Sequence, residues 1–301
     1  MVTGATGFTG QYLLSAALDA GYDCHGTFLG SLDERVRVAE GVTYHACDLT
    51  DVDAVTALVA ALRPHCVVHL AGVAYVAHSS ARAFYDVNLW ATVNLLDALR
   101  AQAPGLEKVL VASSANIYGD AALMPIAETA QPQPVNDYGV SKFAMELACQ
   151  LRMDDLPMVI VRPFNYTGVG QSERFLIPKI VAAFRARQVS IELGNLDVAR
   201  DFSDVRDVVS AYMGLLASDV CGQIFNICSG TATPLRTVIE ILEEMAGYSL
   251  DIAVNPAFVR ENEIRELYGD PASLDGVLGE RPRHLLRDTL AWMLGGAAPS
   301  P

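Results

Sequence analysis

The sequence predicts an α/β fold, with a doubly wound parallel sheet followed by a smaller C-terminal α/β lobe. Two observations carry this prediction. Strand-like and helix-like segments alternate through the first half of the chain, and the strand-like segments are apolar along their whole length. Continuous apolar strands are typical of a parallel sheet that helices cover on both faces. The chain has 301 residues and is 51% hydrophobic, so it can fill the core of such a sheet.

Each element of the first half follows from its local pattern. Short apolar runs predict strands at 1–3, 23–29, 42–49, 66–72, 108–115 and 157–164. Apolar residues at helical spacing predict helices at 10–21, 50–64, 84–102 and 138–152. In the second of these helices Val52, Val55, Val59 and Leu62 recur at helical spacing, and Thr50 is the expected N-cap.

The rhythm changes after Phe164. Loops lengthen, and polar stretches separate helix-like segments such as 175–187 and 234–247. We therefore expect a first domain at 1–164, to which 204–227 returns, and a smaller lobe over most of 165–301. The final stretch, Gly-Gly-Ala-Ala-Pro-Ser-Pro, is expected to be loose.

Charge and cysteine content exclude several kinds of function. The net charge of −14, from 35 acidic and 21 basic residues, disfavours nucleic-acid binding, which needs a basic surface. The six cysteines form no C-x-x-C pair and have no histidine at ligand spacing, so we expect reduced thiols and no metal. No apolar run is long enough to span a bilayer, and the first residues lack a signal-peptide pattern. We therefore expect a cytoplasmic protein with no membrane partner.

The first ten residues contain three glycines, in the pattern T-G-A-T-G-F-T-G between a strand and a helix. Each interior glycine costs about 1 kcal/mol relative to alanine, so bare backbone must be needed here. Backbone without Cβ atoms can approach a pyrophosphate, and the helix start offers unpaired N–H groups. The pattern predicts that 1–164 is a Rossmann-type dinucleotide-binding domain, with cofactor contacts from Gly4, Thr6, Gly7, Phe8, Thr9 and Gly10.

The choice between NAD and NADP stays open. An acidic residue at the end of the second strand would bind a ribose 2′-hydroxyl, and an arginine would bind a 2′-phosphate. The chain has Phe-Leu-Gly at 28–30 instead, and both Asp33 and Arg35 could reach back. Asp48, followed by Leu49, is a candidate partner for an adenine amino group; a solvated loop carboxylate is the alternative.

A tyrosine, a lysine and a serine point to acid–base chemistry. Tyr138 and Lys142 are four residues apart at a helix start, so their side chains share one face. A phenol with a pKa of about 10 exchanges protons poorly near neutrality, and a lysine cation within about 4–6 Å favours the phenolate. Ser114, at a strand end, can hold the same substrate oxygen. A Y-x-x-x-K spacing or a serine at a strand end occurs by chance in many proteins. Their order after the glycine stretch, however, indicates chemistry at a carbinol or carbonyl.

These motifs resemble those of the extended short-chain dehydrogenases/reductases that modify nucleotide sugars. The matching stretches are TGATGFTG at 3–10, DL at 48–49, HLAG at 69–72, Asn88, SSANIYG at 113–119, YGVSK at 138–142 and RPFN at 162–165. GNLDVARDF at 194–202 and R-x-x-E-I at 260–264 resemble the branch that acts on GDP-sugars. That branch contains GDP-mannose 4,6-dehydratases and GDP-4-keto-6-deoxy-D-mannose reductases, and HLAGVAYV and RPFN resemble the reductases most.

The resemblance implies an NAD(P)-dependent reductase that delivers hydride to C4 of a GDP-4-keto-6-deoxyhexose, with a GDP-D-rhamnose-type product. It implies the catalytic residues Ser114, Tyr138 and Lys142. It adds to the cofactor contacts Asp48, Leu49, Leu70, Ala71, Gly72, Asn88, Tyr138 and Lys142. It makes 165–301 mainly a substrate-binding lobe, with the nucleotide sugar held by Asn165, Lys179, Arg200, Arg260 and Glu263. For Lys179, a position on a solvated helix face is the alternative. It also implies a homodimer formed through helices 84–102 and 138–153.

Two other functions remain open at this point. A nucleotide-sugar 4-epimerase with retained NAD would use the same three catalytic residues. A non-catalytic dinucleotide-binding sensor or scaffold would keep only the glycine stretch in use. A dehydratase is not expected, because dehydratases of this group carry a glutamate two residues after the catalytic serine or threonine. The residue at that position is Asn116, whose amide cannot act as a base.

Overall fold

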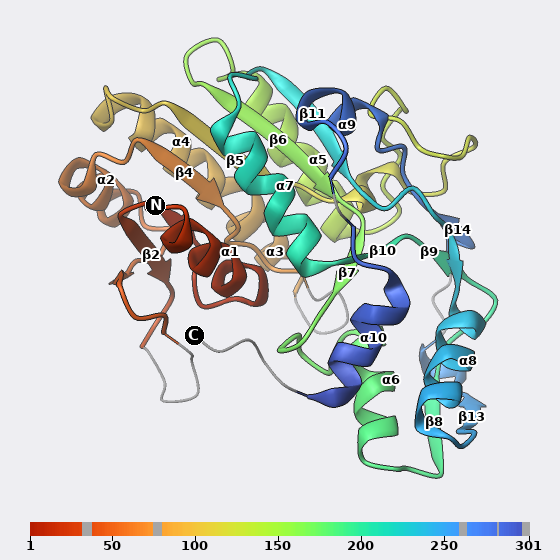
Figure 1. Ribbon diagram of the computed structural model, residues 1–301. Helices are drawn as coiled ribbons and strands as arrows, with labels where there is room; N and C mark the ends of the chain where they lie inside the picture. The colour runs from red at the N-terminus through yellow and green to blue at the C-terminus, as the bar shows by residue number, and fades with distance from the viewer. Residues whose placement is uncertain (32–37, 75–79, 259–263, 282, 297–301) are drawn as a thin grey trace.

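The computed structural model describes residues 1–31, 38–74, 80–258, 264–281 and 283–296 (Figure 1). Its centre is a seven-stranded sheet in the order β11–β6–β5–β4–β1–β2–β3, and each neighbouring pair is parallel. The strands are β1 (Val2–Thr3), β2 (Cys24–Phe28), β3 (Val42–Ala46), β4 (Cys66–His69), β5 (Lys108–Ala112), β6 (Met158–Pro163) and β11 (Gln223–Ile227). The predicted α/β class with a doubly wound parallel sheet is confirmed.

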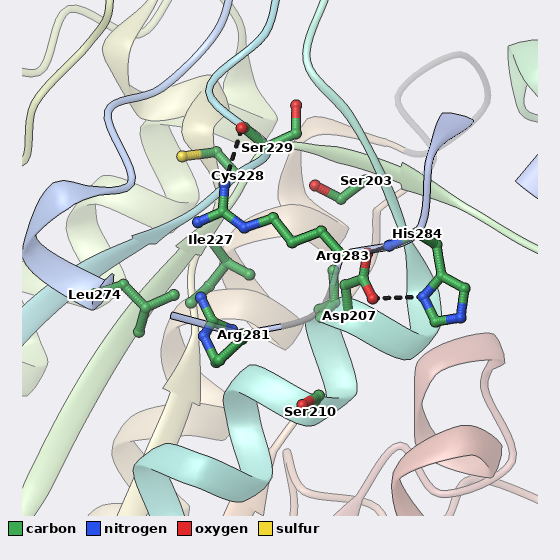
Figure 2. A pocket seen from close by; sticks show the side chains of 11 residues that line it. Ser203, Asp207, Ser210, Ile227, Cys228, Ser229, Leu274, Arg281, Arg283 and His284 are labelled. Atoms are coloured by element: carbon green, nitrogen blue, oxygen red, sulfur yellow. Dashed lines mark hydrogen bonds and ion pairs between the residues drawn. The ribbon is translucent and has the colours of Figure 1, made fainter. Parts of the chain in front are cut away.

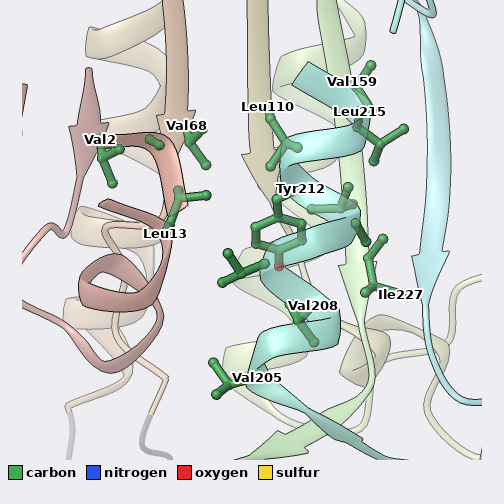
Figure 3. Close-up of a cluster of buried hydrophobic side chains, with 14 of the residues drawn as sticks. Val2, Leu13, Val68, Leu110, Val159, Val205, Val208, Tyr212, Leu215 and Ile227 are labelled. Carbon is green, nitrogen blue, oxygen red and sulfur yellow. The ribbon is translucent and has the colours of Figure 1, made fainter. Parts of the chain in front are cut away.

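Helices cover both faces of this sheet. On one face lie α1 (Phe8–Asp19) and α7 (Val205–Ala217), which pack against each other. Their side chains and those of the strands form the apolar cluster in Figure 3, in which Leu13 and Tyr212 are almost completely buried. The other face is covered by α2 (Val52–Leu62), α4 (Ala91–Gln102) and α5 (Asp137–Gln150) over a second apolar cluster.

The second half of the chain builds a smaller lobe, at the lower right of Figure 1. Its apolar cluster lies among α6 (Leu176–Arg185), α8 (Leu235–Ala246) and α10 (Leu286–Gly295). Three small sheets pair β7 (Asn165–Thr167) with β10 (Phe202–Asp204), β8 (Ser190–Leu193) with β13 (Asp251–Val254), and β9 (Ala199–Arg200) with β12 (Thr233–Pro234) and β14 (Glu266–Leu267). The lobe also has η3, a 3-10 helix (Pro256–Phe258), whereas α9 (Ala272–Leu278) packs against β11 and α7 of the first half. Because β11 belongs to the main sheet and α7 covers one of its faces, 205–227 lies with the first half. The division of cofactor and substrate binding between 1–164 and 165–301 stays a prediction.

Two local predictions differ from the structure. The N-cap of α2 is Asp51 and not Thr50, because the Asp51 carboxylate accepts from the N–H groups of Asp53 and Ala54 and complements the helix dipole. The expected helix 84–102 is three segments, namely α3 (Ala81–Phe84), the π-helical η1 (Tyr85–Trp90) and α4. Residues 297–301 of the expected loose tail lie outside the described residues.

The cysteines are free thiols. Cys24, Cys149 and Cys228 are buried, and burial raises the pKa of each thiol, which makes them unreactive core residues. Within the described ranges no three metal-ligating side chains gather at one point. Over the same ranges, no helix combines the length and apolar composition that crossing a membrane requires.

A buried ion pair joins α5 to β6. Arg162 Nη2 donates to Glu146 Oε2 at 2.7 Å, and the two side chains are 4% and 0% exposed. Arg162 Nη1 also donates to the Tyr118 hydroxyl at 2.8 Å, and that hydroxyl donates to Asn226 Oδ1 at 2.7 Å. Tyr118 ends η2, the 3-10 helix Ala115–Tyr118 that follows β5. The network therefore fixes α5, η2, β6 and β11 relative to one another.

Breaking this ion pair from one side is expected to destabilise the fold strongly. Arg162→Met leaves the Glu146 carboxylate buried without its cation, which typically costs about 3–5 kcal/mol. The double variant Arg162→Met, Glu146→Leu removes both charges and should recover most of that loss. Urea unfolding of both variants and the wild type measures the effect. An Arg162→Met protein as stable as the wild type would contradict the assigned role.

Candidate active site

The glycine turn lies between β1 and α1, where side chains would collide with backbone. A Cβ on Gly4, whose φ is +67°, would lie 2.9 Å from the Ala71 nitrogen, and a Cβ on Gly10 would overlap the Gly4 carbonyl oxygen. Gly7 is exposed and forms the N-cap of α1, and no side chain among the described residues caps this helix start. The first N–H groups of α1 are therefore available to an anion, and the turn fits a pyrophosphate.

Phe8 and Thr9 link the glycine turn to the second half of the chain. The Phe8 ring stacks on Tyr166, with centroids 6.2 Å apart, and Thr9 Oγ1 lies 2.7 Å from the Tyr166 hydroxyl. Thr6 accepts a hydrogen bond from Gln11 Nε2 at its carbonyl oxygen, at 3.0 Å. Tyr166 is half-buried in β7, and sequence reasoning missed it because the motif used there stopped one residue earlier.

The backbone of the loop after β4 packs directly against the backbone of the glycine turn. Thr3 Oγ1 accepts from the backbone N–H groups of Leu70 at 3.2 Å and Ala71 at 3.1 Å. Its own hydrogen is then directed to His69 Nδ1, 2.7 Å away. The predicted cofactor residues Leu70 and Ala71 are thus held beside Gly4 by one threonine hydroxyl.

His69 is a neutral imidazole within this arrangement. Its Nε2 lies 2.8 Å from Thr92 Oγ1, whose own hydrogen is donated to the Asn88 carbonyl at 2.7 Å. Nε2 therefore donates and Nδ1 accepts. Burial, with a smaller contribution from the Lys142 cation, lowers the pKa of His69 to about 3. The ring serves as a structural link and not as a proton carrier near neutrality.

Asn88 lies in the π-helical turn η1 and fixes the backbone next to the predicted cofactor site. Its Oδ1 accepts from the Val73 N–H at 2.8 Å, and its Nδ2 donates to Ser141 Oγ at 3.0 Å. A Cβ on Gly72 would lie 2.9 Å from Asn88 Oδ1 and 3.4 Å from Lys142 Nζ. Gly72 is favoured at this position because a Cβ there would lie too close to the Asn88 amide oxygen.

The three predicted catalytic residues are brought together at the C-terminal end of β5. Ser114, Tyr138 and Lys142 are 5%, 8% and 6% exposed. Ser114 is a neighbour of the Tyr138 phenol, and its interaction with the phenol favours the phenolate. Lys142 lies one turn further along α5, and its Nζ donates to the Ala112 carbonyl at 2.8 Å.

The expected electrostatic effect of Lys142 on Tyr138 is not what the structure shows. Burial raises the pKa of Tyr138 to about 12, although the Ser114 hydrogen bond favours the phenolate. Burial also lowers the pKa of Lys142 to about 8, because its ammonium group has left water for the Ala112 carbonyl. Tyr138 is therefore protonated near neutrality, as a proton donor must be.

Both interpretations of Asp48 remain possible in the structure. The side chain is exposed, and its Oδ1 accepts from the Thr50 N–H at 2.9 Å and the Thr50 hydroxyl at 2.7 Å. Leu49 is buried, and its carbonyl accepts from Asn94 Nδ2 at 3.1 Å. Asp33 and Arg35, which bear on NAD or NADP preference, lie outside the described residues.

The structure describes three of the five predicted substrate-binding residues, and these three lie on different elements of the smaller lobe. Asn165 is exposed at the start of β7. Arg200 Nη1 donates to the carbonyls of Ala199 and Arg265. Lys179 Nζ donates to the Glu192 carbonyl at 2.7 Å and lies 4.7 Å from the centre of the Phe258 ring, next to 259–263. Arg260 and Glu263 fall outside the described residues, so their predicted roles stay predictions.

A separate small cavity lies between α7, the end of β11 and the side chains of Arg281, Arg283 and His284 (Figure 2). Arg283 donates to the Ser229 carbonyl and pairs with Asp275, and His284 pairs with Asp207. The cavity volume is about 30 Å³, enough for about two water molecules and far too small for a nucleotide sugar. None of the predicted catalytic residues lines it, so it is not the substrate site.

Comparison with known proteins places this geometry in a family. Residues 1–228 match the model of the NAD dependent epimerase/dehydratase family. The chain belongs to that family. It is accordingly an NAD(P)-dependent enzyme of the extended short-chain dehydrogenase/reductase type, a nucleotide-sugar oxidoreductase.

Individual relatives within the epimerase/dehydratase family are similar along most of the chain. GDP-6-deoxy-D-mannose reductase of Pseudomonas aeruginosa is 36% identical, over 83% of this chain and 85% of the relative. GDP-6-deoxy-D-talose 4-dehydrogenase of Aggregatibacter actinomycetemcomitans is 33% identical, over 93% of this chain and 90% of the relative. The structure of RMD from Pseudomonas aeruginosa complexed with NADPH matches with a TM-score of 0.82 and 32% identity, over 98% of this chain and 97% of that one.

The residues present fit the cofactor that the epimerase/dehydratase family uses. The uncapped start of α1 and the bare backbone at Gly4 and Gly10 leave room for its pyrophosphate. Lys142 Nζ lies beside the bare backbone at Gly72, and these two residues would hold the nicotinamide ribose of the cofactor. Family members bind NAD or NADP.

The neutral His69 is expected to make the fold sensitive to acid. The pKa of His69 is about 3 in the folded protein against an ordinary 6.5, so between these values the unfolded chain binds one more proton. Stability should fall as the pH drops through this window, by about 2 kcal/mol from pH 7 to pH 5. Urea unfolding at both pH values measures it. His69→Gln should lose about that much of the pH dependence, and an unchanged dependence would refute the assignment.

Proposed function

We propose that the protein is a nucleotide-sugar 4-ketoreductase, which reduces the C4 keto group of a GDP-4-keto-6-deoxyhexose with NADPH or NADH. The main support for this proposal is that the side chains of Ser114, Tyr138 and Lys142 are buried close to one another, with Lys142 near the Gly72 backbone. Two relatives named for GDP-6-deoxyhexoses, a reductase and a 4-dehydrogenase, support the substrate class. Both names describe redox chemistry at a deoxyhexose, which favours this function over epimerisation.

The chain's own residues supply position, a proton and charge. Bound NADPH or NADH supplies the hydride that adds to C4. As the C4–oxygen double bond becomes a single bond, Tyr138 releases its proton to that oxygen, and the phenolate left behind keeps a hydrogen bond from Ser114. The Lys142 ammonium, which lies near the Gly72 backbone, would hold the nicotinamide ribose of the bound cofactor.

Basic and polar residues of the smaller lobe would bind the nucleotide part. Arg200 and Arg260 suit the diphosphate, because a guanidinium pairs with two oxygens at once. Asn165 lies in the strand that carries Tyr166 to the glycine turn, and can reach the sugar. Glu263 would accept hydrogen bonds from ribose hydroxyls. Lys179 would have to leave Glu192 to reach a phosphate.

Incubation with GDP-4-keto-6-deoxymannose tests the function directly. We expect one NADPH or NADH consumed per sugar, and NMR of the product gives the configuration at C4. Tyr138→Phe should lower kcat at least about 100-fold because the proton donor is lost, with cofactor affinity unchanged. Tyr22→Phe, a change at an exposed tyrosine, serves as the control.

Other outcomes of the same assay would reject the proposal. Interconversion of sugars without net cofactor consumption would identify an epimerase. Cofactor binding with no turnover of any keto-sugar would identify a sensor or scaffold. Conversion of GDP-mannose to its 4-keto-6-deoxy product would overturn the role given to Asn116.

We further propose that the protein forms a homodimer through α4 and α5. Leu147 and Leu151 are one turn apart on α5 and its C-terminal end, and they are 47% and 83% exposed. Burying both against a second copy removes this apolar surface from water. Replacing both with glutamate should give a monomer in sedimentation experiments, whereas Leu29→Glu, at another exposed leucine, should not. A dimer that survives the double change would contradict this interface.

A further inference from the structure

The hydroxyl of Ser114 accepts two hydrogen bonds from the same residue. Asn116 donates its backbone N–H to Ser114 Oγ at 3.2 Å and its side-chain Nδ2 at 3.1 Å. A serine oxygen has two lone pairs and one hydrogen, so both of its acceptor positions are filled. The hydrogen of Ser114 is left to donate. The first turn of α5 rests on the Asn116 backbone at Gly139, which brings the neighbouring Tyr138 to Ser114, and the Tyr138 phenol is the acceptor that we infer for this hydrogen.

We propose that Asn116 is a positioning residue that sets the direction of hydrogen bonding at the reacting centre. Asn116 donates to Ser114, Ser114 donates to Tyr138, and the remaining hydrogen of Tyr138 points to the substrate oxygen. When that proton leaves, the Tyr138 phenolate already has a donor in place, so no group has to rotate during the transfer. This inference rests on the proposed function and adds to it a residue that never touches the substrate.

The local fold holds Asn116 rigidly enough for this role. Asn116 lies in the single turn of η2, which Ser114 caps at one end. At the other end the Tyr118 hydroxyl is held by Arg162. The Asn116 carbonyl lies under the first turn of α5, where a Cβ on Gly139 would be 2.7 Å away. A shift of Asn116 would therefore disturb three elements at once.

The chemistry requires an amide at position 116. A carboxylate of the same shape has no hydrogen to donate, so it would accept from Ser114 and draw the hydroxyl hydrogen away from Tyr138. Tyr138 would then have to donate to Ser114 or leave its oxygen without a donor. With asparagine, the series of hydrogen bonds runs from residue 116 through Ser114 to Tyr138. With aspartate, the hydrogen bond between residue 116 and Ser114 would run in the opposite direction.

Neutron diffraction from deuterium-exchanged crystals of the full chain with bound NADP⁺ tests the direction without any substrate. We expect a deuterium on Asn116 Nδ2 directed at Ser114 and the Ser114 deuterium directed at Tyr138. A Ser114 deuterium directed at Asn116 Oδ1, or a Tyr138 deuterium directed at Ser114, would overturn the proposal. This result stands whether or not the keto-sugar proves to be the substrate.

Kinetics of Asn116→Asp test the consequence. We expect kcat to fall about 10- to 100-fold in both directions, with cofactor affinity within about twofold. For oxidation of the reduced sugar, in which Tyr138 must accept a proton, the rising limb of the pH–rate profile should move up by about one pH unit. Asn116→Ala leaves Ser114 free to keep donating, so it should cost only about threefold and leave the limb in place.

The stability and the pH–rate profile of the Asn116 variants together distinguish a structural role of Asn116 from a positioning role. An Asn116→Asp protein that unfolds more easily but keeps the wild-type pH limb has lost only packing, and that outcome would reject the positioning role. Equal pH shifts in Asn116→Asp and Asn116→Ala would also reject it. A wild-type protein that reduces no keto-sugar would reject the proposed function instead, while the deuterium positions still decide the proposal.

Discussion

The site depends on one close approach, in which the first turn of α5 rests directly on the backbone of η2. Gly139 makes this possible, because a side chain there would collide with the Asn116 carbonyl and with Pro134. Tyr138 and Lys142 are carried by the same helix, so any added spacing would withdraw both from the end of β5. The chemistry of the site thus rests on the absence of a single Cβ atom.

The buried Arg162–Glu146 pair maintains this approach from the other end. Glu146 lies one turn beyond Lys142 on α5, and Arg162 reaches it from β6 while also holding Tyr118 of η2. The negative charge of Glu146 also raises the pKa of Lys142 against the larger effect of burial. A buried pair of this kind is costly to desolvate, and its value here lies in fixing three elements relative to one another.

The sequence predicted those features that are repeated along many residues. The continuous apolar strands indicated the parallel sheet, and the spacing of Tyr138 and Lys142 placed both on one helix face. Features set by single tertiary contacts were missed or mistaken. The direction of the pKa shift at Tyr138 is set by the burial of its phenol in the folded chain, and Tyr166 reaches Thr9 only because the chain folds back.

The smaller lobe was harder to predict for a related reason. Its strands β9, β12 and β14 have two residues each, which is too short for any periodic pattern to register. The partners of Lys179 and Arg200 are backbone carbonyls, and no sequence motif specifies these. In the smaller lobe, residue type alone therefore suggested candidate substrate-binding residues. In the first half, the sequence pattern also predicted where the site residues lie in the fold.

The π-helical turn at Tyr85–Trp90 lets one continuous helical segment contact both the loop after β4 and the apolar cluster on the sheet. Each residue of an ordinary α-helix advances the side-chain direction by about 100°, so a regular helix would tie the orientation of Asn88 to that of Leu95 and Leu99. The wider turn breaks that phase relationship. Asn88 can then be placed for the loop after β4, while the residues beyond it are placed for the apolar cluster under the sheet. The two surfaces can consequently vary independently, since a change in the packing residues need not rotate the amide.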